Sequence, residues 1–222
     1  MPLLSCATLI ALTMLAAIGA AQSAPAPSAL DVADRLQKKY DTIRDFSADF
    51  VQRYEGGALR RTREERGTLL VKKPGKMRWN YKQPEEKLFV SNGVRFYQYV
   101  PADRQVMVAD APDESQPAMA FLAGKGRLTR DFNVSFATGQ AARATDRWTL
   151  HLEPKTPQAE FDWLEIAASR DGLVLRTLVV AEKQGSRSTF TFSNFKENPG
   201  LADKDFEFAI PKGVEVTHAG KR

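Results

Sequence analysis

Residues 71–93, VKKPGKMRWNYKQPEEKLFVSNG, carry the strongest indication of the fold. Met77, Trp79 and Tyr81 are two residues apart, so on an extended strand they share one face while the residues between them point to the other. Proline and glycine at 74–75 predict a turn before this strand. The segment therefore predicts a basic turn, a strand with an aromatic face and a second apolar strand.

Alternating apolar and polar residues recur along nearly the whole chain and predict about ten strands. The other alternating runs are residues 46–53, 67–72, 95–100, 105–109, 132–136, 148–152, 164–168, 173–183, 190–192 and 206–210. The last run, with Phe206, Phe208 and Ile210, predicts a final strand. Short turns between the runs imply one large antiparallel sheet.

A helix is predicted before the first of these strands. Residues 29–44 carry apolar side chains at spacings of three and four, including Leu36 and Tyr40, and charged side chains on the other face. Ser28 followed by Asp31 three residues later is a helix-capping pattern. The apolar face of this helix is expected to pack against the sheet.

A second helical segment interrupts the strands at residues 115–124, where Met119, Phe121 and Leu122 are apolar and a glycine marks the end. Residues 128–132 can add another turn. Two or three short helices cannot cover a sheet of this size as a complete layer. They can close the concave face of a strongly curved sheet.

The start of the chain predicts export. Residues 3–21 are almost wholly apolar, without a charged side chain, and small residues and a proline-rich stretch follow. This is typical of a secretory signal, which we assign to residues 1–23 with cleavage after Ala21 or Ser23. The first residues contain no lysine or arginine, so an uncleaved membrane anchor is the alternative. Against it, the apolar run is short for a membrane span.

Residues 24–222 then form the mature protein, long enough for one domain with a substantial core. Cys6 is the only cysteine and precedes most of the apolar run, which argues against lipid attachment there. The mature chain would have no disulfide and no thiolate metal site. Its formal charge of +5 admits anionic partners. Export makes nucleic acid a poor candidate.

Motifs for catalysis are absent from the sequence. Its two histidines, His151 and His218, have no neighbouring ligand at a metal spacing, and there is no G-x-S-x-G or glycine-rich phosphate loop. Acidic pairs at 64–65 and 85–86 lie in strongly charged stretches, where solvated charge is the usual explanation. We therefore expect no enzyme, no metal and no cofactor.

Several motifs share an order that resembles the LolA family of periplasmic lipoprotein carriers. They are D-F-x-A-x-F-x-Q at 45–52, the K-K-P turn, the Trp79 strand, P-x-M-x-x-L at 117–122 and F-x-F-x-x-P-x-G at 206–213. The resemblance covers essentially the whole mature chain. It implies an α+β, mainly β fold: a single strongly curved antiparallel sheet, an incomplete β-barrel of about ten or eleven strands, with two or three short helices as a lid over an apolar cavity.

The resemblance also implies a lipid-binding cavity. The candidate lining residues are Leu36, Tyr40, Met77, Trp79, Tyr81, Met119, Phe121 and Leu122. Each of them can equally be an ordinary core residue. In the family, an arginine before the turn proline is taken to hold the lid shut, and here that position is Lys73. A lysine has no planar five-donor fork, so its latch can be looser or differ in geometry.

The function implied is that of a periplasmic chaperone that binds the acyl chains of lipoproteins released from the inner membrane and carries them to the outer membrane. Its implied partners are an inner-membrane ABC-type lipoprotein-releasing transporter and an outer-membrane lipoprotein acceptor, and we expect a monomer. The alternative is an exported, non-catalytic module on the same scaffold that binds other lipids or senses lipoproteins. The basic residues 60–66 and the 72–73 turn are candidate docking surfaces, and solvated charge is the alternative for residues 60–66.

Overall fold

The computed structural model describes residues 26–56, 62–111, 121–124, 126–159 and 161–219. Its elements are α1 (Ala29–Thr42), β1 (Asp45–Glu55), β2 (Thr62–Lys72), β3 (Lys76–Gln83), β4 (Lys87–Asn92), β5 (Arg95–Val100), β6 (Gln105–Asp110), α3 (Leu128–Asp131), β7 (Phe132–Phe136), η1 (Ala141–Arg143), β8 (Arg147–Pro154), β9 (Phe161–Ser169), β10 (Leu175–Glu182), η2 (Lys183–Gly185), β11 (Arg187–Glu197), η3 (Asp203–Phe206) and β12 (Glu215–His218).

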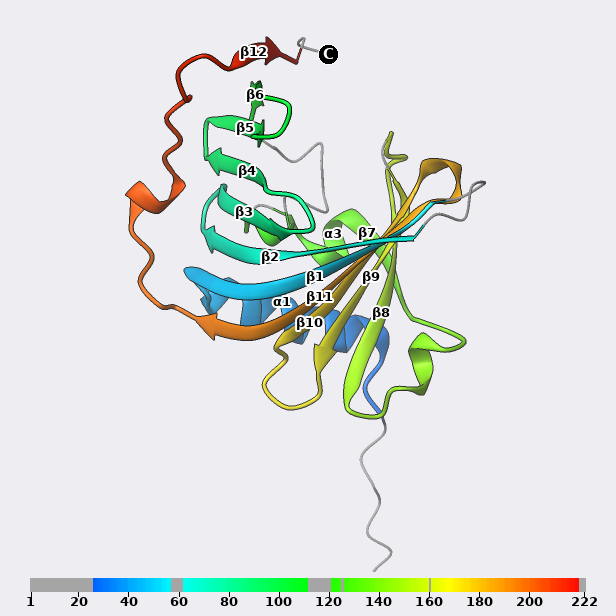
Figure 1. Cartoon of the computed structure of the whole chain (residues 1–222). Helices are drawn as coiled ribbons and strands as arrows, with labels where there is room; N and C mark the ends of the chain where they lie inside the picture. The colour runs from blue at the N-terminus through cyan, green and yellow to red at the C-terminus, as the bar shows by residue number, and fades with distance from the viewer. Residues whose placement is uncertain (1–25, 57–61, 112–120, 125, 160, 220–222) are drawn as a thin grey trace, which may run out of the picture.

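All of these strands belong to one twelve-stranded sheet in the order β12-β6-β5-β4-β3-β2-β1-β11-β10-β9-β8-β7. The sheet is strongly curved, and its two end strands, β7 and β12, are not paired with each other (Figure 1). This confirms the predicted incomplete barrel, with one strand more than the upper expectation of eleven. Most consecutive strands pair because their connections are short, whereas β6 and β7 lie far apart in the sheet.

Helix α1 begins where the sequence predicts. The Ser28 side chain accepts a hydrogen bond from the Asp31 backbone N–H, and the Asp31 carboxylate accepts one from the Ser28 backbone N–H, which completes a capping box. Leu36 and Tyr40 lie on its buried face. The predicted helix at 115–124 is described only from residue 121, and its earlier residues lie outside the described part of the chain. The predicted turn at 128–132 is α3.

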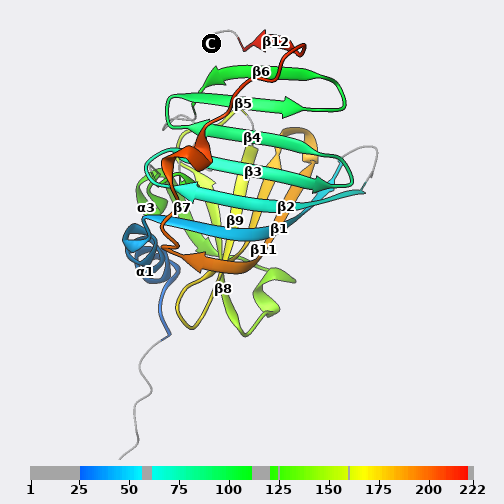
Figure 2. The same ribbon diagram turned by 60° about the vertical axis from the view of Figure 1, so that its left-hand side comes forward.

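Two expectations about the end of the chain are wrong. Residues 206–210 do not form a strand: η3 and the residues after it cross the outer face of the sheet as a strap, defined here as residues 199–214 (Figure 2). The chain then adds β12 to the edge of β6 in parallel, so the sheet is not wholly antiparallel. A connection that crosses the sheet before pairing can deliver a parallel strand, whereas a tight hairpin cannot.

The strap explains why the buried face changes along the sheet. In β3 the buried residues are on the concave face, but the fully buried Val90 of β4 is paired with Arg78, which points outward. Arg78 reaches the strap and donates hydrogen bonds to the carbonyls of Asp205 and Glu207, each at 3.3 Å. Beyond β3, therefore, the outer face of the sheet is also apolar and is covered by the strap.

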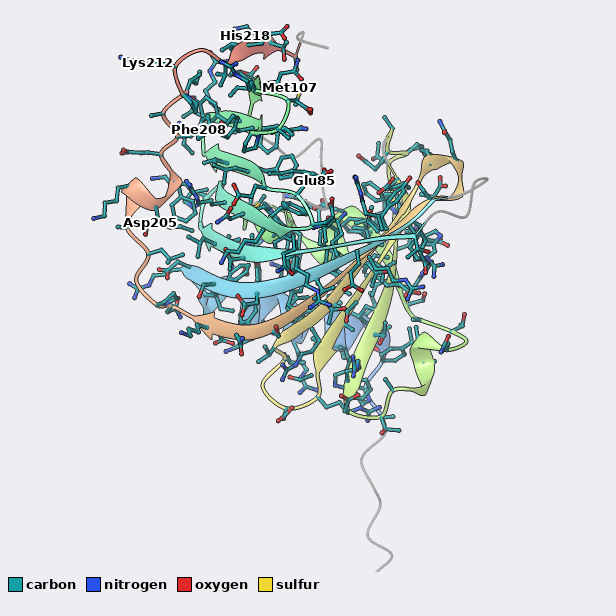
Figure 3. The ribbon with its side chains drawn as sticks, in the orientation of Figure 1. Glu85, Met107, Asp205, Phe208, Lys212 and His218 are labelled. Atoms are coloured by element: carbon teal, nitrogen blue, oxygen red, sulfur yellow. The ribbon has the colours of Figure 1, made fainter. Side chains whose placement is uncertain are left out.

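Aromatic side chains anchor the strap to this outer face. Phe206, in η3 against β3 and β4, is fully buried, and the Phe208 ring lies 5.3 Å from that of Tyr97 and 5.7 Å from that of Tyr99. Figure 3 shows Phe208 on the side of the strap and Met107 on the concave side. The alternating apolar residues at 206 and 208 correctly indicated side chains that pack against the protein. The pattern arises from packing on a sheet and not from a strand within it.

We predict that the strap contributes strongly to stability. Phe206→Ala should lower the free energy of unfolding by about 3–5 kcal/mol, since it removes a fully buried ring. Ile210→Ala, at an exposed position of the same strap, should change it by less than about 0.5 kcal/mol. Urea unfolding followed by circular dichroism measures both. Equal effects of the two substitutions would show that Phe206 does not anchor the strap.

Candidate functional site

The concave face of the sheet carries a cluster of aromatic rings around Trp79. Phe50 of β1 lies 5.1 Å from the Trp79 ring and 4.8 Å from the Tyr81 ring, in both cases edge to face. Phe190 and Phe192 of β11 lie 5.3 and 6.4 Å from Trp79. The cluster therefore joins strands that are far apart in sequence into one apolar surface.

Local backbone features position these rings. Gly67 of β2 faces Phe50, and a Cβ there would clash with the Asn80 carbonyl oxygen, so the ring and the neighbouring strand can approach only because the residue is glycine. In β11 the register shifts around Asn194, whose φ is +50°. This bulge brings Phe195 onto Phe46, with ring centroids 4.8 Å apart.

Helix α1 and residues 121–124 cover one end of this surface. The Tyr40 hydroxyl donates a 2.7 Å hydrogen bond to the Leu122 carbonyl, and the Tyr40 ring stacks on Phe121 at 4.8 Å. The Gly75 N–H, in the β2–β3 turn, donates to the Ala123 carbonyl at 3.0 Å. We call α1 together with residues 121–124 and 126–131 the lid.

A second group of contacts ties the two parts of the lid to each other. The Arg127 guanidinium lies 2.6 Å from the Asp41 carboxylate, and the Leu128 N–H donates a 3.0 Å hydrogen bond to the Gln37 side-chain oxygen. These polar contacts are at the surface, where each is worth little. The lid is therefore joined mainly by the buried Tyr40 contacts.

Lys73 lies at the junction of the lid and the sheet. Its ammonium group donates a hydrogen bond to the Tyr40 carbonyl and lies 3.6 Å from the centre of the Tyr40 ring. A Cβ on Gly124 would clash with the Lys73 side chain, so the lysine stem runs closely over this glycine. Lys73 therefore touches both parts of the lid.

The environment of Lys73 changes its protonation. Burial lowers the pKa of its ammonium group from 10.5 to about 8, and the nearby Asp41 carboxylate opposes this shift. Burial also raises the pKa of Tyr40 well above its ordinary value, so its hydroxyl remains a donor. At neutral pH the contact is thus between a charged lysine and a neutral tyrosine.

The described residues leave little free space beneath the lid. The gap lined by Leu36, Tyr40, Ile43, Phe121 and Phe195 has a volume of about 10 Å³, which is room for one water molecule. Sites for drug-sized ligands are usually about 300–1,000 Å³. At this end of the concave face, therefore, the described side chains leave no room for a ligand of that size.

Four polar side chains, which we call the polar ring, border the concave face at the end away from the lid. The Tyr81 hydroxyl donates a 2.6 Å hydrogen bond to Gln52, and Lys87 and Glu65 form an ion pair at 2.5 Å. The strand register puts all four side chains on the concave face. Burial and the Glu65 carboxylate raise the pKa of Tyr81, which keeps its hydroxyl protonated.

The structure brings most of the candidate lining residues together. Leu36, Tyr40, Met77, Trp79, Tyr81, Phe121 and Leu122 are all buried, and they belong to one core cluster. Met119 lies outside the described residues. The sequence did not single out the phenylalanines around Trp79 or the polar ring. Their alternation was visible, but only the strand register shows which residues face Trp79.

A curved sheet whose apolar concave face lies under a lid belongs to the class of proteins that can enclose an apolar ligand. The sequence pattern of the family described as outer membrane lipoprotein carrier protein LolA matches residues 41–209, and the chain belongs to this family.

Curated relatives agree with this assignment, and one solved structure shares the fold. The chain is 29% identical to the outer-membrane lipoprotein carrier protein of Chromohalobacter salexigens over 92% of its length and 96% of the relative's. It is 31% identical to that of Cupriavidus pinatubonensis, with 86% and 89% covered. An uncharacterized conserved protein from Thermus thermophilus, 13% identical, shares the fold with a TM-score of 0.53, over 86% of this chain and 99% of that one.

The described part of the chain lacks two features. None of its helices is both long and apolar enough to span a membrane. No cluster of three or more histidine, cysteine, aspartate or glutamate side chains in those residues is arranged to hold a metal ion.

We predict that the Lys73 pKa makes stability depend on pH. Between about pH 8 and pH 10.5 the unfolded chain holds a proton at Lys73 that the folded chain has lost, so the free energy of unfolding should rise with pH in this window. Below pH 8 both states are protonated and the contribution is constant. Because solvent screens the charge at this partly exposed site, we expect the free energy of unfolding to rise by about 1 kcal/mol.

Lys73→Arg is the matched control, because a guanidinium stays charged throughout this range. Urea unfolding of both proteins at pH 7.5 and pH 10 isolates Lys73, since all other titrating groups are shared. Parallel pH profiles would show that the ammonium group is not buried in the folded state.

Proposed function

We propose that this protein is a periplasmic, non-catalytic chaperone that binds the acyl chains of lipoproteins released from the inner membrane and carries them to the outer membrane. The observation that carries the proposal is the aromatic concave face under a lid that Lys73 and Tyr40 join to the sheet. Family membership supports it, because relatives over most of the chain are named as outer-membrane lipoprotein carriers.

The energetics of such a carrier follow from burial and from lid opening. Each methylene removed from water contributes about 0.8 kcal/mol, so a chain of about fifteen gains on the order of 12 kcal/mol. The carrier must nevertheless release its cargo. A lid that is stable when closed reduces the net affinity by the free energy of opening, because cargo binds only to the open state.

The remaining parts of the proposal concern export and partners. We propose that residues 1–23 are a cleaved signal and that residues 24–222 form the carrier domain. An ABC-type lipoprotein-releasing transporter is proposed as the donor and an outer-membrane lipoprotein as the acceptor. The mass of the protein recovered from the periplasm tests the cleavage, and crosslinking to purified membranes tests the partners.

We predict that Trp79 reports cargo binding. In a Trp148→Phe, Trp163→Phe variant, Trp79 is the remaining tryptophan. A triacylated lipopeptide should change its fluorescence, since it must displace the rings that now surround the indole. Emission that stays constant while the lipopeptide binds, as measured independently, would remove Trp79 from the lining of the cavity.

We also predict that Lys73 is the lid latch. Lys73→Ala removes both the ammonium contact with Tyr40 and the stem over Gly124, which favours the open, loaded state. The variant should accept lipoprotein from the donor normally and release it about tenfold more slowly, consistent with a charged hydrogen bond of about 1.5 kcal/mol. Lys73→Arg should transfer normally.

Lys72→Ala is the control for charge alone, because Lys72 belongs to the same turn but its ammonium lies 2.6 Å from Asp203 of the strap. Loading and release are measured separately. A loading defect that both alanine variants share and that worsens with salt would indicate a docking surface instead of a latch. Normal release by Lys73→Ala would eliminate the latch.

A further inference from the structure

The indole N–H of Trp79 is a buried donor without an acceptor. The side chain is 5% exposed, and Nε1 has no hydrogen-bond partner within the part of the chain that the structure describes. Leaving such a donor unpaired in the interior is uncommon in folded proteins and unfavourable. The position therefore needs a physical explanation.

The described side chains that surround Trp79 supply no acceptor. Its neighbouring rings are Phe50, Phe190 and Phe192, and its cross-strand partners are Leu69 and Phe89, all without side-chain oxygen or nitrogen. Aromatic faces accept hydrogen bonds only weakly. The donor is thus enclosed by apolar side chains on the face that the proposed function assigns to cargo.

The nearest polar groups along the strand are already paired. Tyr81, two residues further on the same face, donates its hydroxyl proton to Gln52, and beyond it Lys87 is paired with Glu65. In the other direction Met77 and Tyr40 continue the apolar surface towards the lid. Trp79 therefore lies at the boundary between a polar ring and an apolar surface.

We propose that Trp79 donates its indole N–H to the ester carbonyl oxygen of a bound acyl chain and so makes the site prefer acyl chains over alkyl chains without that carbonyl. This inference rests on the proposed function. An ester carbonyl sits at the junction of the polar head and the apolar tail of a lipid. With that carbonyl at Trp79, the head lies towards Tyr81 and Lys87 and the tail towards Met77 and the lid.

The selectivity follows from pairing the donor. An alkyl chain removes the same apolar area from water as an acyl chain of equal length, but it offers the indole N–H no carbonyl oxygen. We expect the acyl chain to bind about fivefold more tightly, which is the effect of a typical neutral hydrogen bond of about 1 kcal/mol. Trp79 is then a specificity-determining residue of the site.

A matched pair of lipids tests this. 1-Palmitoylglycerol and 1-O-hexadecylglycerol have equal chain lengths and headgroups, but the second has an ether in place of the ester. The protein should bind the ester about fivefold more tightly in a titration below micelle-forming concentrations. Trp79→Phe should bind both equally, whereas Trp163→Phe, which changes an indole on β9, should keep the preference.

A spectroscopic measurement does not depend on whether Trp79→Phe folds. In the Trp148→Phe, Trp163→Phe variant, the ultraviolet resonance Raman band that is sensitive to indole hydrogen bonding should shift when the ester binds, and should shift less when the ether binds. Binding of a triacylated lipopeptide, measured in parallel, reports the proposed function separately.

The outcomes are distinct. Lipopeptide binding with equal affinities for ester and ether, or with no Raman shift on ester binding, overturns the assignment to Trp79 and leaves the carrier function intact. Loss of the ester preference in Trp163→Phe as well as in Trp79→Phe overturns it too. If the lipopeptide and both glycerol lipids fail to bind, the proposed function falls and this inference falls with it.

Discussion

The apolar concave face of the sheet must be covered whenever it holds no ligand, and this constraint shapes the rest of the molecule. The strongly curved sheet does not close into a barrel: its end strands, β7 and β12, are not paired with each other. Short helical segments therefore cover the face, with Phe121 and Tyr40 filling it. A cover made of side chains can be withdrawn, whereas a closed barrel packed with its own core cannot open without unfolding.

The outer face is stabilised in a different way. The strap buries Phe206 and ends as β12, which pairs with β6 and so protects an edge strand. The contacts of the strap with Arg78, Tyr97 and Tyr99 are made to the sheet and do not involve the lid. Opening the lid thus need not disturb the strap, since the two lie on opposite faces of β3 and β4.

The contact of Lys73 with Tyr40, which we propose as a latch, combines an attraction with a cost. Its ammonium binds Tyr40, but burial of the charge lowers its pKa to about 8 and offsets part of the attraction. Because the free energy of burying the charge offsets part of the attraction, the contact between Lys73 and Tyr40 can break readily. The unpaired indole of Trp79 is similar, because it makes the empty state less favourable than a fully satisfied core.

Local patterns in the chain were enough to specify most elements: the capping pattern at Ser28 marked the start of α1, and alternation marked the aromatic face of β3. Lys73, by contrast, was singled out only through the resemblance to the LolA family and not by a local pattern. Which faces meet could be read only from the folded chain, because register and long-range pairing depend on contacts between residues far apart in the sequence. Phe206 shows the limit most clearly, since the same alternating pattern is produced by a strand and by a strap packed on a sheet.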